Sequence, residues 1–442
     1  MNPKMSSGPN PVSKSRVSSM FRALAHRNFQ LFFSGQLISL IGTWMDNIAE
    51  AWLVYRLTGS SLLLGTVAFA GQIPVFLMAP IGGMVADRFS RHKIVIATQA
   101  SSMVIAFTLA GLTLSGRVKV WEVIVLAALM GIVNGFDIPA RQSFLVEMVG
   151  REDLMNAIAL NSSMFNGARV IGPSIAGIIV AGVGEGWCFF ANAVSYIAVI
   201  TGLLMMKLGP RQRMVIETSP FEHIAEGFRF VFRARPIRAL LLLIGLVSFV
   251  AIPYSVLMPI FAGDILHGGA LGLGLLMGSA GVGALLGALT LTLRSGVKGL
   301  GRLVGYAAIG FGLSLLLFSL SRYFWLSCAL LVPAGYGVML QMASCNTLIQ
   351  TMVPDNLRGR ALAAYTMMFM GMAPMGALFA GFMAEHIGAP WTVTIGGAVA
   401  IIGGIFFLKV WPGLRFEARG LISATHTVGP RAGEEIPAEK MS

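Results

Sequence analysis

The sequence predicts an all-α membrane protein with twelve transmembrane helices in two parallel six-helix halves. Of its 442 residues, 56% are hydrophobic and only 12% are charged, and the mean hydropathy is +0.77. Soluble proteins carry about 25% charged residues. The apolar runs continue for about 20 residues without alternating, which favours helices over a β-barrel. The two halves also resemble each other in sequence, which predicts that they are parallel repeats.

Twelve apolar segments are each long enough to cross about 30 Å of hydrocarbon. They are residues 29–56, 62–86, 94–114, 120–146, 155–182, 187–206, 239–261, 270–293, 302–320, 324–350, 361–384 and 390–411. The first six segments make an N-terminal half, residues 29–206, and the last six make a C-terminal half, residues 239–411. Six helices in each half place both termini on the same side of the membrane.

Three polar segments flank and separate the halves. Residues 1–28 form a basic, Ser-rich head without the apolar core of a signal peptide. Residues 207–238 form a linker in which apolar residues repeat at helical spacing, so we expect an amphipathic helix there, packed against the protein. Residues 412–442 are expected to be a disordered cytoplasmic tail.

The distribution of basic residues predicts the orientation. Arg56, Arg117, Lys119 and Arg322 are the basic residues that fall on outer loops when the N-terminus lies inside, and most of the remaining Lys and Arg fall on inner segments. This bias follows the positive-inside rule and places both termini in the cytoplasm. It also explains the formal charge of +13 without nucleic acid as a partner.

The two halves resemble each other in sequence. Without gaps, residues 148–177 align with residues 352–381, and several small or apolar residues are identical. Because an even number of spans separates the copies, they share one orientation, as parallel repeats of a transporter do.

The loop after the second span reads GGMVADRFSRHK, residues 82–93. It resembles the loop signature of the major facilitator superfamily, in which a glycine and three residues precede Asp-Arg-x-Gly-Arg. Gly83, Asp87, Arg88 and Arg91 match, and Ser90 stands in place of the second glycine. The resemblance implies the major facilitator fold and a gating role for Asp87 against the opposite half. An ordinary positive-inside loop would explain the basic residues but not the acid.

The fifth span contains ARVIGPSIAG, residues 168–177, which is similar to the glycine-proline signature of exporters in this superfamily. Gly172, Pro173 and Gly177 match. Small residues around a proline would also suit ordinary helix packing. Residues 27–65 and the segment from Asp137 are similar to the branch that contains enterobactin and macrolide exporters, which implies efflux of small molecules.

Asp46, Glu50, Asp137, Arg141 and Arg169 lie well inside predicted spans. Each ionised acid at the centre of a membrane helix costs roughly 2.5 to 3.5 kcal/mol, so these residues need partners or a function. A spacing of four predicts an ion pair between Asp137 and Arg141. We expect the pair to be structural or to take part in gating.

The two acids of the first span share one helix face. Counted from the cytoplasmic ends of their helices, Asp46 lies about 25 Å and Arg169 about 21 Å into the membrane. This predicts an Asp46–Arg169 contact if the first and fifth spans are neighbours, and it leaves Glu50 as the less compensated acid. Glu50 would then take up and release protons. The alternative is that Glu50 lies at the hydrated outer interface, in which case Asp46 or Asp137 would be the proton-coupling residue.

Aromatic and methionine side chains lie on spans that line the central cavity in the resembling superfamily. The candidates are Trp44, Phe136, Tyr254, Tyr336 and Met339. Such a cavity suits amphipathic cargo.

Together these features predict a proton-coupled exporter of amphipathic small molecules in a bacterial-type inner membrane, such as a drug, macrolide or siderophore exporter. The alternatives are a lysophospholipid transporter, an intramembrane enzyme with a metal at Asp46 and Glu50, and a membrane receptor without transport. No P-loop occurs, so we expect no ATP hydrolysis by this chain, and no cofactor or metal. The expected partners are the small-molecule substrate, protons and membrane lipids, and we expect a monomer.

Overall fold

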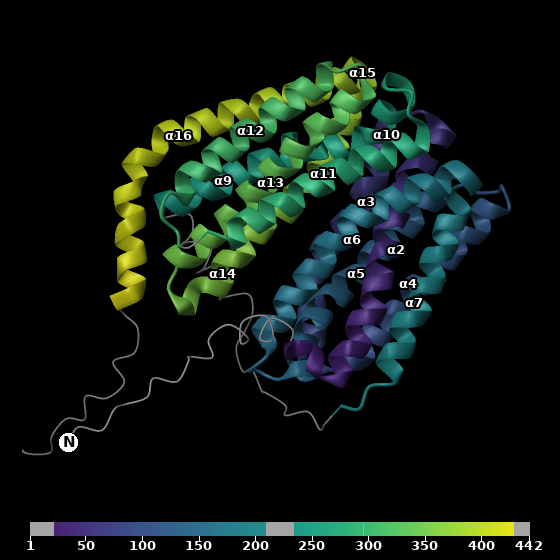
Figure 1. The fold of residues 1–442 in the computed structure, drawn as a ribbon, viewed down its shortest axis with the longest axis horizontal. Helices are drawn as coiled ribbons and strands as arrows, with labels where there is room; N and C mark the ends of the chain where they lie inside the picture. The colour runs from purple at the N-terminus through teal and green to yellow at the C-terminus, as the bar shows by residue number, and fades with distance from the viewer. Residues whose placement is uncertain (1–21, 209–233, 295, 428–442) are drawn as a thin grey trace, which may run out of the picture. The chain divides into compact units, whose positions relative to one another are not determined.

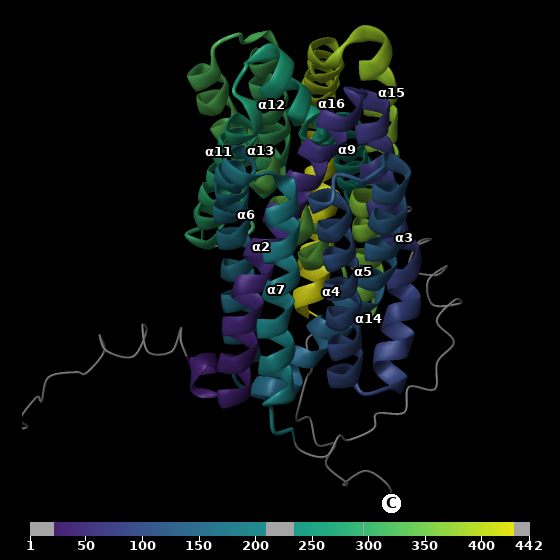
Figure 2. The ribbon, with the colours of Figure 1, turned by 90° about the vertical axis from the view of Figure 1, so that its right-hand side faces the viewer.

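The computed structural model describes residues 22–208, 234–294 and 296–427, and every regular element in these ranges is helical (Figures 1 and 2). In the first part of the chain the helices are η1 (Arg22–Ala25), α2 (Arg27–Thr58), α3 (Ser61–Arg88), α4 (Arg91–Leu114), α5 (Val120–Val149), α6 (Leu154–Val183) and α7 (Glu185–Leu204). Then follow α9 (Arg235–Val250), η2 (Ile252–Leu257), α10 (Met258–Ile260), η3 (Phe261–Ile265) and α11 (Gly269–Thr292). The last helices are α12 (Leu300–Leu320), α13 (Phe324–Met352), α14 (Asp355–Thr366), η4 (Met367–Gly371), α15 (Met372–Ile387) and α16 (Ala389–Thr427).

The helices coincide with the predicted spans. Within the described ranges, 11 helical stretches are long and apolar enough to cross a membrane. Helix α2 is not among them, but its 32 residues extend over about 48 Å. The predicted all-α membrane fold is confirmed, with α2 as the span that carries the acids.

Prolines interrupt the seventh span. After α9 ends at Val250, the chain forms a 3-10 helix, a short α-helix and a π-helix up to Ile265. Pro253 and Pro259 lie in this stretch and cannot donate the backbone hydrogen bonds of a regular α-helix. The span therefore changes its helix type about halfway along its length.

The chain divides into two compact units. Unit 1 comprises Met1–Met214 and Val256–Gly281, and unit 2 comprises Val215–Ser255 and Val282–Ser442. Unit 1 therefore includes the C-terminal part of the seventh span and the N-terminal part of the eighth, whereas the sequence placed the boundary between the halves in the linker. Helix α7 packs against both α2 and α4 in unit 1, and α16 packs against both α12 and α9 in unit 2.

Small residues set the distance between paired helices. In unit 1, a Cβ added at Gly82 of α3 would overlap the backbone of Gly135 on α5, and one added at Gly131 of α5 would overlap the backbone of Gly71 on α3. In unit 2, Gly312 of α12 meets the backbone of Gly397 on α16 in the same way. Such small-residue contacts let membrane helices approach closely, where lipid supplies no hydrophobic driving force.

The tail prediction is partly wrong. Helix α16 continues to Thr427, so residues 412–427 are helical and not disordered. Leu414, Ala418 and Ile422 recur at a spacing of four and continue one face of the helix, and Ala418 is 4% exposed. Pro412 lies within the helix, and α16 bends along its length in Figure 1. The predicted linker helix, residues 1–21 and residues 428–442 lie outside the described ranges.

Candidate functional site

The acids of the first span lie on a helix that packs closely against α7. A Cβ added at Gly42 of α2 would come within 2.7 Å of Asn192 Oδ1 and 2.9 Å of Ser195 Oγ, both on α7. Asp46 follows Gly42 by one helical turn, so it faces the same neighbouring helix. The glycine thus brings the Asp46 carboxylate next to polar side chains of α7.

Asp46 is incompletely hydrogen-bonded in this position. The carboxamide of Asn192, which is 1% exposed, lies beside it. Even so, Asp46 Oδ1 and Asn192 Nδ2 are both buried without a hydrogen-bond partner among the described residues. Buried polar groups in membrane proteins are normally satisfied, and unsatisfied ones often mark functional sites. Asn192 was not among the predicted site residues, although a lone Asn in an apolar span is a recognisable signal.

Glu50 lies one turn further along α2 and is half-buried. Among the residues that the structure describes, none forms a hydrogen bond or ion pair with its carboxylate, and the charge that acts on it is that of Asp46. Two acids of like charge on one helix face repel each other when both are ionised. The α2 pair therefore contains charge without a described counter-ion.

Arg169 lies beside Trp44 of α2. Helices α2 and α6 are neighbours, as the predicted Asp46–Arg169 contact requires. The guanidinium of Arg169, however, lies 5.8 Å from the centroid of the Trp44 ring, a cation–π arrangement. Phe165 packs edge-on against the same indole at 5.6 Å. Asp46 lies beside Asn192 of α7, and the Asp46–Arg169 contact stays a prediction.

The predicted ion pair between Asp137 and Arg141 is present. Arg141 Nε lies 3.0 Å from Asp137 Oδ2. Asp137 is 3% exposed, and its Oδ1 accepts hydrogen bonds from Thr98 Oγ1 at 2.7 Å and from Gln99 Nε2 at 3.0 Å. Both oxygens are thus bonded, which makes Asp137 the most fully satisfied acid in the membrane. Thr98 and Gln99 were missed, although adjacent polar residues on an apolar span are a detectable signal.

The signature loop is anchored to α5 within unit 1. Arg91 Nη1 donates to the Ser143 carbonyl and to Glu147 Oε1, both at 3.1 Å, and Arg91 Nη2 lies 3.7 Å from Asp87 Oδ1. Asp87 and Arg88 are exposed. Gly82 makes the close contact with α5. A Cβ added at the matching signature residue Gly83 would meet no atom within 4 Å in this structure. The gating role of Asp87 stays a prediction.

The glycine-proline segment of α6 contacts two helices within unit 1. Gly172 packs against Trp44 of α2, where an added Cβ would overlap the Trp44 Cβ. Gly177 and the Pro173 carbonyl meet Gly274 of α11. The close packing is confirmed, whereas a role of this segment in export stays a prediction.

Two polar contacts at the predicted outer end of α2 were also missed. Arg56 Nε donates to Glu185 Oε1 at 2.7 Å and Arg56 Nη2 to Glu185 Oε2 at 3.2 Å, so the pair is bidentate and Glu185 is buried. Tyr55 Oη donates to Asp264 Oδ1 at 2.5 Å, next to Gly263. Neither pair has a local sequence signal, because the partners are more than a hundred residues apart.

The predicted cavity residues are distributed over both units. Trp44 and Phe136 belong to unit 1, and Tyr254, Tyr336 and Met339 belong to unit 2. Tyr254 is 7% exposed and packs edge-on against Phe311, and Met339 contacts Gly287. Their role as cavity lining stays a prediction. Within the described ranges, no group of three His, Cys, Asp or Glu side chains is placed to hold a metal ion.

Comparison with known proteins identifies transporters. The chain is 26% identical to the staphyloferrin A transporter of Staphylococcus aureus, covering 84% of this chain and 93% of that protein. It is 26% identical to the multidrug efflux pump Tap of Mycolicibacterium fortuitum, covering 78% and 87%. It is 25% identical to the enterobactin exporter EntS of Salmonella choleraesuis, covering 88% and 94%.

Solved structures show the same fold. The D-xylose-proton symporter aligns with a TM-score of 0.66 at 15% identity, covering 89% of this chain and 98% of that one. The nucleoside transporter NupG aligns with a TM-score of 0.67 at 14% identity, covering 88% and 99%. The family model of the transmembrane secretion effectors matches residues 18–440. The chain is therefore a multi-pass membrane transporter, not an enzyme, and belongs to the transmembrane secretion effector family of the major facilitator superfamily.

Proposed function

We propose that this protein exports amphipathic small molecules, of the drug or siderophore type, in exchange for protons by alternating access. The observation that carries the proposal is the acid pair of α2, in which Asp46 has an unbonded carboxylate oxygen and Glu50 has no described counter-ion. The relatives' names, which include siderophore exporters and a multidrug efflux pump, support the class of cargo and the direction. The charge distribution supports an orientation with both termini in the cytoplasm.

Glu50 is the better candidate for the proton carrier. An ionised carboxylate within the membrane costs roughly 2.5 to 3.5 kcal/mol, and protonation removes the charge and this cost together. Asp137 differs from Glu50 because its carboxylate already contacts Arg141, Thr98 and Gln99. A carboxyl without such partners changes its charge with its exposure to water. Proton binding then favours one conformation over the other, as coupling requires.

The proposal predicts that Glu50→Gln abolishes proton-driven transport while the protein still folds. Glutamine keeps the size and polarity of the side chain but cannot carry a proton. Asp46→Asn is expected to lower the rate of proton-driven transport less than Glu50→Gln does, because Asp46 lies against the polar side chain of Asn192. The measurement is substrate flux by the full chain in proteoliposomes under an imposed pH gradient, with the proton flux followed by an internal dye.

Glu417→Gln is the matched control, because it removes an exposed carboxylate from the end of α16. It should transport like the wild type. Full proton-driven transport by both Glu50→Gln and Asp46→Asn would exclude the α2 acids as the coupling site. The cargo class is tested separately by a panel of drugs and siderophores in an efflux-deficient bacterial host, with and without a proton uncoupler. An unchanged accumulation of every compound would contradict the cargo class.

A further inference from the structure

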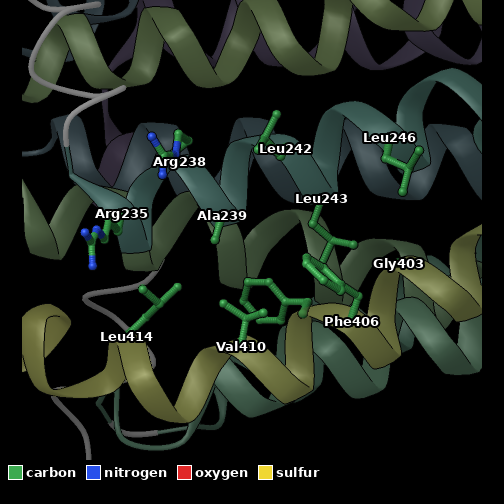
Figure 3. A pocket seen from close by; sticks show the side chains of 11 residues that line it. Arg235, Arg238, Ala239, Leu242, Leu243, Leu246, Gly403, Phe406, Val410 and Leu414 are labelled. Carbon is green, nitrogen blue, oxygen red and sulfur yellow. The ribbon is translucent and has the colours of Figure 1, made fainter.

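An apolar groove runs along the surface of unit 2 between α9 and α16. It has a volume of about 410 Å³ and is lined by Arg235, Arg238 and nine apolar or small residues (Figure 3). Leu242 is 58% exposed and Phe406 is 68% exposed, so its side walls are open at the protein surface. In a membrane-spanning chain this surface faces lipid.

The groove is polar at one end only. Arg235 and Arg238 lie on the first turns of α9, whereas Leu246 and Gly403 lie at the far end. From Arg235 to Leu246 the groove follows 11 residue steps of α9, which is roughly 16 Å at 1.5 Å per residue. This length is about half of the ~30 Å hydrocarbon thickness, so the groove spans one leaflet.

The dimensions and charges of the groove match a lipid. We propose that it binds a phospholipid with an anionic headgroup, with an acyl chain along the apolar walls and the phosphate at Arg235 and Arg238. In the orientation proposed above, the arginines lie at the cytoplasmic headgroup level, where anionic lipids attract basic side chains. Lys409 and Arg415 are further exposed basic residues on the adjoining part of α16, and Glu417 is the acidic residue of that stretch.

A lipid fits the groove better than a protein segment does. An amphipathic helix at the interface lies in the membrane plane, whereas this groove runs along its two helices and therefore across the leaflet. A helix is also about 10 Å wide with its side chains, whereas an acyl chain needs only a narrow channel. The bound lipid would fill the space between α9 and α16 on the cytoplasmic side.

The test is native mass spectrometry of the full chain with added palmitoyl-oleoyl phosphatidylglycerol or phosphatidylcholine. The wild type should retain phosphatidylglycerol preferentially. The double variant Arg235→Gln/Arg238→Gln should lose this preference by roughly 20-fold, because each basic residue near an anionic surface contributes about 1 kcal/mol and 1.4 kcal/mol is tenfold. Ala239→Trp, which fills the groove with both charges intact, should lower the binding of both lipids.

The matched control is Lys93→Gln/Arg151→Gln, which removes two exposed basic residues from unit 1 and should leave lipid retention unchanged. If Ala239→Trp does not fold, Val410→Trp fills the same groove from α16. Unchanged phosphatidylglycerol retention in the double arginine variant would overturn the headgroup assignment. Unchanged binding in the tryptophan variant would overturn the acyl-chain assignment. Both readouts are independent of transport, so a failure of the proposed export function would not alter them.

Discussion

Replacing Arg141 with methionine tests whether the Asp137 network stabilises the fold. Asp137 is 3% exposed and lies 3.0 Å from Arg141 Nε. Removal of one partner from a buried ion pair leaves an uncompensated charge and costs about 3 to 5 kcal/mol. We therefore expect Arg141→Met to lower the free energy of unfolding by about this amount. Methionine keeps the aliphatic length, so little of the loss should come from packing.

Two further variants separate the charge from the hydrogen bonds. Thr98→Val removes the hydroxyl that donates to Asp137 at 2.7 Å and should cost about 1.5 to 3 kcal/mol, the range for hydrogen bonds to charged groups. In the double variant Asp137→Asn/Arg141→Met neither charge remains, so it should be more stable than Arg141→Met alone. The measurement is the unfolding equilibrium in mixed detergent and SDS micelles, followed by tryptophan fluorescence.

The order of these three stabilities is the decisive result. A double variant that is less stable than Arg141→Met would show that the carboxylate remains stabilised without the arginine. Equal stabilities of Arg141→Met and Thr98→Val would show that the ion pair contributes no more than one hydrogen bond. Either result would refute the argument that Arg141 is the counter-ion on which the buried Asp137 charge depends.

Two other predictions concern glycines that contact aromatic side chains. Gly172→Ala should destabilise the protein by about 1 to 3 kcal/mol, because its Cβ would overlap the Trp44 Cβ, whereas Gly167→Ala, with open space around it, should be neutral in the same unfolding assay. Equal effects would contradict the close α2–α6 contact. Gly263→Ala should lower the unfolding midpoint more than Tyr55→Phe does, because the added methyl overlaps the Tyr55 ring, whereas the exposed hydrogen bond contributes only about 0.5 to 1.5 kcal/mol. The reverse order would show that the hydrogen bond matters more than the packing.

Features that depend only on residues close together along the chain could be predicted from the sequence. The spans follow from hydropathy, because the cost of an unsatisfied backbone in lipid leaves few structures other than a helix. The Asp137–Arg141 pair follows from a spacing of four, which places both side chains on one helix face. These predictions needed no knowledge of which helices are neighbours.

Contacts between helices could not be predicted in the same way. Counting residues placed Asp46 and Arg169 at similar depths, but depth does not determine the rotation of a helix about its axis. The structure turns Asp46 towards Asn192 on α7 and places Arg169 over Trp44. The extension of α16 to Thr427 was missed for a different reason, because the expectation of disorder rested on the composition of residues 412–442 as a whole.

The charges in the membrane differ in how well they are compensated, and this difference supports the proposal that the acids of α2 carry protons. Asp137 and Arg141 neutralise each other, and Arg169 lies against an aromatic ring. Two ionised acids on α2 without such partners would cost about 5 to 7 kcal/mol on insertion scales, which is comparable to the whole stability of many domains, about 5 to 15 kcal/mol. A cost of this size is removed when the carboxyls are protonated or reach water. Asp46 and Glu50 are therefore the described acids whose charge has most reason to change during transport.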